Sequence, residues 1–118
     1  PRLFHSMKTS RFVAVSFVLT VAGAALAAYA ADAAANWTDH CAKCHGPDGK
    51  GQTKMGKKLG LRDLSDAKVQ AKFTDEESIK AMKKGLTDDK GKVTMKPAEG
   101  LSEDELKALV PFVRALKK

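Results

Sequence analysis

The five residues from position 41 to position 45 constrain this chain more than any other part of its sequence. They read Cys-Ala-Lys-Cys-His, so two thiols lie three positions apart and an imidazole follows the second. Residues at i and i+3 share one side of a helical turn, so Cys41 and Cys44 can both reach the two vinyl groups of one porphyrin. His45 would then lie beneath the ring, where a ring nitrogen can bind the iron. The motif therefore predicts covalent attachment of a c-type haem.

Three alternative interpretations of these residues fit less well. A structural zinc site needs four Cys or His ligands, and the chain has two cysteines and three histidines, of which His40 directly adjoins Cys41. A dithiol oxidoreductase expects strands and a βαβ pattern around its Cys-x-x-Cys, and the sequence has no convincing strands. A disulfide between Cys41 and Cys44 would close a very small loop and leave the following histidine unexplained. Haem attachment is therefore preferred.

The N-terminal segment, residues 1–30, is predicted to be a signal peptide. Lys8 and Arg11 precede a long apolar stretch without charge, and the Ala-Tyr-Ala that ends at Ala30 is a small-residue cleavage signal. Cleavage after Ala30 would leave a single domain, residues 31–118.

An uncleaved membrane anchor is the alternative for the same segment, because the apolar stretch from Phe12 to Ala31 is just long enough to span a bilayer core. Its richness in alanine makes it a poor anchor. We expect Met7 to be the true start, and both interpretations place the rest of the chain outside the cytoplasm. The sequence therefore predicts a periplasmic or otherwise exported protein that meets a membrane only if the leader is uncleaved.

The region after the leader is a small basic domain of 88 residues. Its 18 lysines and arginines outnumber its 14 acidic residues by four, and its aromatic residues are Trp37, Phe73 and Phe112. An apolar core of this size gives little stability unaided, and a porphyrin would supply the missing apolar bulk. The basic charge lacks the aromatic interleaving and recognition motifs of nucleic-acid binding, so we expect no nucleic-acid partner.

Helix signals are found throughout this domain, which predicts an all-α fold. Residues 33–44 lack Gly and Pro and favour a helix that delivers the cysteine motif. The glycine-rich residues 50–60 are expected to be a loop beside the haem edge, with a short helix after Ser65. Thr74 and Glu77 form a capping box for a further helix.

The last helix is the best specified of the chain. Ser102 and Glu105 form its capping box, and the stripe of apolar residues that follows has helical spacing. Pro111 lies inside this helix and removes the hydrogen bond to the Lys107 carbonyl. We expect a bend at Pro111 and not an end.

A six-coordinate iron needs a second axial ligand besides His45. His40 lies on the proximal side, Met82 shares a helical stripe and is more typical of a core, and Met55 lies ten residues after His45 near the proximal edge. Met95 lies fifty residues from His45, in an irregular stretch between two predicted helices that can cross the opposite face. We therefore favour Met95, with an ordinary methionine as the alternative at that position.

Several motifs together resemble one known family. They are the residues Cys41 to His45, the Gly-Pro-Asp-Gly-Lys-Gly loop at 46–51, Met95 shortly before a proline, and the Leu-Ser-x-x-Glu-Leu start of the last helix. In these features the chain resembles small bacterial class I cytochromes c over residues 37–118. The resemblance implies the class I cytochrome c fold, with the N- and C-terminal helices packed together and shorter helices and loops around one covalent haem c.

The resemblance also implies contacts between the terminal helices. In this family an aromatic residue before the first cysteine packs on a Leu-x-x-aromatic pair of the last helix, which corresponds to Trp37, Leu109 and Phe112 here. The small residue that lets the helices touch would be Ala33. The chain lacks the family's loop proline whose carbonyl accepts the imidazole proton, and we expect that acceptor among the backbone carbonyls of residues 52–57.

These features imply one function and leave two alternatives. With His45 as proximal and Met95 as distal iron ligand, the iron can change oxidation state without binding a substrate, which indicates a single-electron carrier and not an enzyme. The alternatives are an open-site haem protein that binds or reduces peroxide, nitrite, CO or NO, and a membrane-tethered relay subunit of a larger oxidoreductase. We expect a monomer that docks on redox proteins, whose acidic surfaces would attract its lysines.

Overall fold

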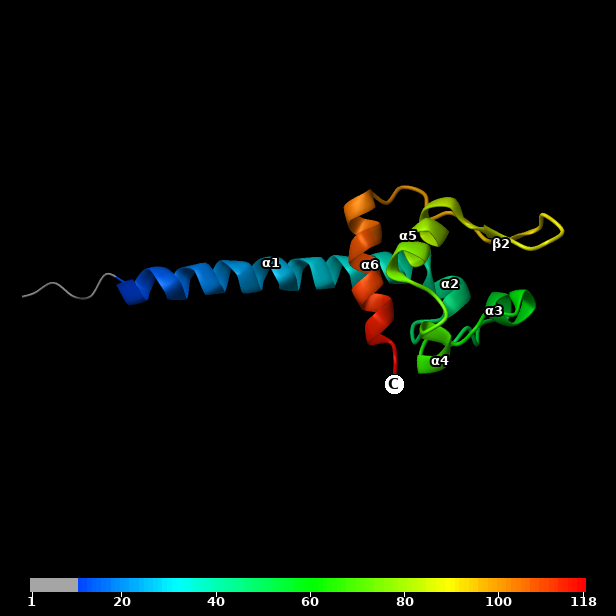
Figure 1. Cartoon of the computed structure of the whole chain (residues 1–118), viewed down its shortest axis with the longest axis horizontal. Coiled ribbons are helices and arrows are strands. Elements are labelled where there is room, and N and C mark those ends of the chain that lie inside the picture. The colour runs from blue at the N-terminus through cyan, green and yellow to red at the C-terminus, as the bar shows by residue number, and fades with distance from the viewer. Residues whose placement is uncertain (1–10) are drawn as a thin grey trace, which may run out of the picture.

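The computed structural model describes residues 11–118 and shows a mainly helical chain (Figure 1). The elements in chain order are α1 (Arg11–His40), α2 (Ala42–His45), α3 (Lys54–Leu59), α4 (Ala67–Gln70), α5 (Asp75–Lys84), β1 (Leu86–Thr87), β2 (Val93–Met95) and α6 (Glu103–Ala115). The predicted start Met7 and the leader residue Lys8 lie outside the described residues. The architecture is that of the predicted helical fold, with two short strands added.

Helix α1 begins well before the helix that was predicted from residue 33. The segment upstream is rich in alanine, the strongest helix former, and this allows α1 to continue through it. Among the α1 residues whose side chains the structure describes, Ala33 is the first that is buried, and those between Gly23 and Asp32 are exposed. This part of α1 projects away from the other elements (Figure 1). Cleavage after Ala30 stays a prediction.

In the part of the chain whose side chains the structure describes, no helix is long and apolar enough to cross a membrane.

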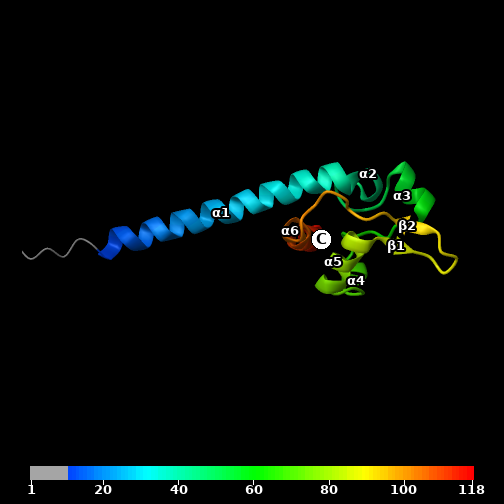
Figure 2. The same cartoon turned by 90° about the horizontal axis from the view of Figure 1, so that it is seen from above.

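The core lies where α1 crosses α6. Ala33 and Trp37 of α1 are 2% and 4% exposed, and Leu109 of α6 is completely buried. The rings of Trp37 and Phe112 lie 5.4 Å apart at an angle of 38°, a tilted aromatic contact. Figure 2 shows α6 nearly end-on beside α1. The predicted packing of the N- and C-terminal helices, with Ala33 at their contact, is therefore confirmed.

Both predicted capping boxes are formed. The Ser102 hydroxyl accepts the Glu105 N–H at 3.2 Å, and the Glu105 carboxylate accepts the Ser102 N–H at 2.7 Å. Thr74 and Glu77 make the same reciprocal pair at the start of α5. Hydrogen bonds from Ser102 favour the charged form of the Glu105 carboxylate, and so they lower the pKa of Glu105. Pro111 lies inside α6, which continues to Ala115 as expected.

The expectation of a chain without strands is wrong at one place. β1 and β2 form an antiparallel hairpin in which Leu86 pairs with Met95, and a bulge shifts the next pair. The Asp88 carboxylate closes the turn by accepting the backbone N–H groups of Lys90 and Lys92. Strands of two and three residues are too short to show alternation in a sequence. Met95 therefore lies on a strand and not in an irregular stretch.

The predicted loop at 50–60 contains a short helix, α3. The Thr53 hydroxyl caps its start by accepting the Gly56 N–H at 2.9 Å, and Gly60 ends it with a left-handed φ of 66°. The three glycines of this segment have a low helix propensity and therefore favoured the prediction of a loop. Thr53 and Gly60 are nevertheless typical helix-cap residues. The short helix expected after Ser65 is present as α4, capped by Asp66.

Candidate haem attachment site

The cysteine motif consists of Cys41, which lies between α1 and α2, and of α2 itself. The Cys41 N–H donates to the Trp37 carbonyl, and the Cys44 and His45 N–H groups both donate to the Cys41 carbonyl. These bonds hold residues 41–45 in a helical turn, which is the geometry that brings positions i and i+3 to one side. Both thiols are free and half-buried. The structure therefore leaves the two sulfur atoms available for thioether bonds to one ligand.

The thiol of Cys41 is a weak acid in this environment. Burial, and to a smaller extent the neighbouring Cys44, raises the pKa of the Cys41 thiol to about 11. Cys41 therefore keeps its proton at neutral pH.

The imidazole of His45 carries a buried nitrogen without a partner. Nδ1 makes no hydrogen bond to any described residue, and burial lowers the pKa of His45 below its ordinary value. A neutral imidazole with a free ring nitrogen can bind a metal ion. Buried polar atoms are rarely left unsatisfied, so this atom indicates that the site is built for a further group.

The expected carbonyl acceptor for the His45 ring within residues 52–57 is not formed. The loop instead directs donors at the motif: the Thr53 hydroxyl donates to the Cys44 carbonyl at 2.6 Å, and the Gly51 N–H donates to the His45 carbonyl at 2.7 Å. These two bonds hold the backbone at Cys44 and His45. The sequence prediction missed this role of Thr53, for which its position as a helix cap was the available signal.

Trp37 connects the core to the motif. Its indole N–H donates to the Gly46 carbonyl at 3.1 Å in a buried hydrogen bond, and its ring centroid lies 5.6 Å from that of His45. Because Gly46 directly follows His45, this bond holds the end of α2 against the packed terminal helices. The same residue therefore stabilises the core and positions the candidate ligand.

The other ligand candidates lie on different elements. Met95 is on β2, half-buried and packed against the core, whereas Met82 belongs to the buried core itself. Met55 lies on α3, and His40 is exposed at the end of α1. Both views place β2 and α2 at the same end of the molecule (Figures 1 and 2). The position of Met82 agrees with its interpretation as a core residue.

Several apolar side chains around the core are partly exposed to solvent. Leu64, Phe73, Ile79 and Leu101 pack against the buried cluster but remain half-buried themselves. Cys41 packs against the same cluster, so the motif brings two free thiols and one unpartnered imidazole nitrogen to an apolar region. These residues fit a covalently attached haem.

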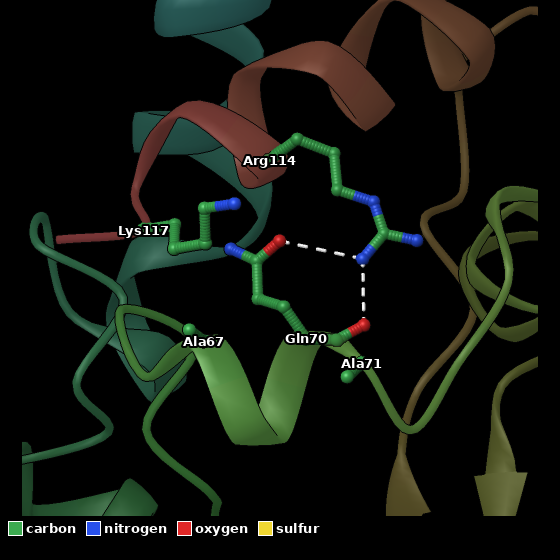
Figure 3. Close-up of a pocket in the computed structure, with 5 residues that line it drawn as sticks. All are labelled: Ala67, Gln70, Ala71, Arg114 and Lys117. Carbon is green, nitrogen blue, oxygen red and sulfur yellow. Dashed lines mark hydrogen bonds between the residues drawn. The ribbon is translucent and has the colours of Figure 1, made fainter.

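A surface cavity of about 310 Å³ lies between α4 and α6 (Figure 3). Arg114, which lines it, donates to Asp75, to the Phe73 carbonyl and to both oxygen atoms of Gln70. Gln70 in turn donates to the Leu64 and Val113 carbonyls. These donors are used within the protein, so Arg114 and Gln70 tie the middle of the chain to α6.

No three His, Cys, Asp or Glu side chains converge as a metal site within the part of the chain that the structure describes.

Comparison with known proteins identifies the class of this site. A family model described as cytochrome c matches residues 30–117. Together with the helical fold and the Cys-x-x-Cys-His turn, this match defines a c-type cytochrome. The chain belongs to the cytochrome c family, whose members typically transfer electrons and carry covalent haem c.

Solved structures agree with this assignment. The chain is similar to the KustC0563 c-type cytochrome, with 41% identity and a TM-score of 0.59, over 70% of this chain and 93% of that one. It is also similar to a Kustc0563 point mutant, with 39% identity and a TM-score of 0.61, over 73% of this chain and 99% of that one. The search of curated proteins found no match.

Proposed function

We propose that this c-type cytochrome is an exported single-electron carrier with one haem c per chain. Cys41 and Cys44 would hold the haem through two thioethers, with His45 as proximal and Met95 as distal iron ligand. When bound, the haem supplies an iron that changes between Fe(III) and Fe(II). The single observation that carries the proposal is the buried, unpartnered Nδ1 of His45, in a motif whose two thiols are free.

The chain's own residues favour a site that changes little between oxidation states. The Cys44 carbonyl accepts from the Thr53 hydroxyl, and the His45 carbonyl accepts from the backbone N–H of residue 51. Trp37 donates to the Gly46 carbonyl. A thioether such as that of Met95 is a soft ligand that favours ferrous iron, so it would raise the reduction potential relative to a second histidine. Fixed ligands on both faces would leave no position for a substrate, which supports a carrier over an enzyme.

Partner recognition would depend on the lysines near the motif and the hairpin. Exposed examples are Lys43, Lys54, Lys57, Lys58, Lys92 and Lys96. Clustered positive charge accelerates encounter with acidic surfaces, and the effect falls as ionic strength rises. We propose redox proteins with acidic docking surfaces as partners of a monomeric carrier. Export is usual for c-type cytochromes and would follow from the predicted leader.

Substitution of Met95 by leucine tests the distal ligand. Leucine keeps the volume but cannot bind iron, so the weak far-red absorption band that Met sulfur gives to ferric haem should disappear in Met95→Leu. Met55→Leu is the matched control and should keep the band. Persistence of the band in Met95→Leu would refute the assignment of Met95, and its loss in Met55→Leu would assign the ligand to α3.

A further inference from the structure

A glycine at the end of α5 lies against the backbone of Met95. Gly85 has a φ of 73° and a ψ of −177°, a conformation that residues with side chains rarely adopt. A β-carbon at this position would lie 2.5 Å from the Met95 carbonyl oxygen and 3.0 Å from Cδ of Pro97. Such a distance to a backbone oxygen is not tolerated. The Met95 backbone can therefore occupy its place because residue 85 has no side chain.

Two further contacts hold residues 95–98, the segment that touches Gly85. The Ala98 N–H donates to the Met82 carbonyl at 2.8 Å, and Met95 pairs with Leu86 across the hairpin. Pro97 has a fixed φ and no N–H, so the segment between Met95 and Ala98 has little freedom to move away. A displacement at Gly85 would therefore reach Met95 and would not be absorbed locally.

We propose that Gly85 is a positioning residue for Met95. Because Gly85 lacks a β-carbon, the Met95 backbone can lie against the end of α5, and this determines the position of the methionine sulfur atom. The proposal deepens the proposed function, because it rests on Met95 as the distal iron ligand. Its consequence is that an alanine at position 85 should weaken the bond between iron and sulfur without touching either.

The hairpin offers a matched control for this experiment. Gly91 also has a positive φ, 77°, but a β-carbon there would meet nothing within 4 Å. Gly91→Ala therefore carries a similar backbone cost without the contact. In haem-loaded protein, Gly85→Ala should reduce the far-red band and bind CO about tenfold faster than Gly91→Ala, which should resemble the native protein.

A second measurement separates the position of Met95 from its ligation. In protein labelled with ¹³C at the methionine methyl groups, Met95→Leu assigns the Met95 signal. Gly85→Ala should move this signal and Gly91→Ala should not. An unchanged signal in Gly85→Ala, or equal changes in both variants, would overturn the positioning role. A native protein without the far-red band, in which Gly85→Ala still moves the signal, would refute ligation by Met95 and leave the positioning intact.

Pro97→Ala covers the case in which Gly85→Ala does not fold. Pro97 is exposed, so its substitution leaves the core unchanged, but it frees the segment that rests on Gly85. The Met95 methyl signal should then shift or broaden relative to the native protein. A sharp signal at the native position in folded Pro97→Ala would overturn the proposal.

Discussion

The double variant Cys41→Ser/Cys44→Ser should lose covalently bound haem completely. Serine keeps the size of the side chain but cannot form a thioether, and the chain has no other cysteine. When the protein is produced in a host that attaches haem to exported proteins, a haem stain after denaturing electrophoresis should be positive for the native chain and negative for the double variant.

The single variants serve as controls for this experiment. Cys41→Ser and Cys44→Ser each keep one thiol of the motif, so each should retain a reduced amount of covalent haem. A conservative change outside the motif, Lys43→Arg, should leave the stain unchanged. Covalent haem in the double variant would show that attachment does not depend on these thiols.

Replacement of Trp37 should cause the largest loss of stability. Trp37→Ala removes a ring that is 4% exposed and contacts both Phe112 and His45, and buried aromatic truncations cost about 3–5 kcal/mol. The free energy of unfolding in urea measures this loss. The folded fraction should fall with it, because domains of this size have little stability to spare.

Trp37→Phe separates the hydrogen bond from the packing. Phenylalanine keeps an aromatic ring but cannot donate to the Gly46 carbonyl, so it should cost about 1–3 kcal/mol, less than alanine. The visible spectrum should also respond, because Gly46 directly follows His45. Equal stability of Trp37→Phe and the native protein would mean that the indole hydrogen bond contributes nothing to the fold.

The sequence predicts the helical framework well because its signals are local. The capping boxes at Thr74 and Ser102 need residues just three positions apart. The packing of Trp37 on Leu109 and Phe112 is not a local signal, and its prediction came from the family pattern. The hairpin could not be predicted in this way. Its strands are held by pairing between Leu86 and Met95 and by the Asp88 turn, and pairing over such short strands leaves no periodicity.

The candidate site was predictable to a similar extent. The spacing of Cys41, Cys44 and His45 is a covalent property of the chain and identifies the motif without a structure. The hydrogen bonds from Thr53 and Gly51 depend on how the following loop folds back, which the sequence does not specify. The expected acceptor for the His45 ring failed for this reason, since the loop presents donors to the motif instead of carbonyls.

The close approach at Gly85 is a further feature that no sequence pattern indicates. A glycine after a helix is ordinarily interpreted as a helix cap, and Gly85 is one. Its contact with the Met95 carbonyl becomes apparent when the hairpin returns to α5 in three dimensions.

Addition of CO to the reduced native protein tests the central claim most directly. If His45 and Met95 occupy both axial positions, CO has no free site, and the visible spectrum should stay unchanged on mixing at neutral pH. Met95→Leu should bind CO rapidly under the same conditions, which shows that the assay can detect an open site. Rapid formation of a CO complex by the native protein would contradict a closed electron carrier and would support the open-site haem protein.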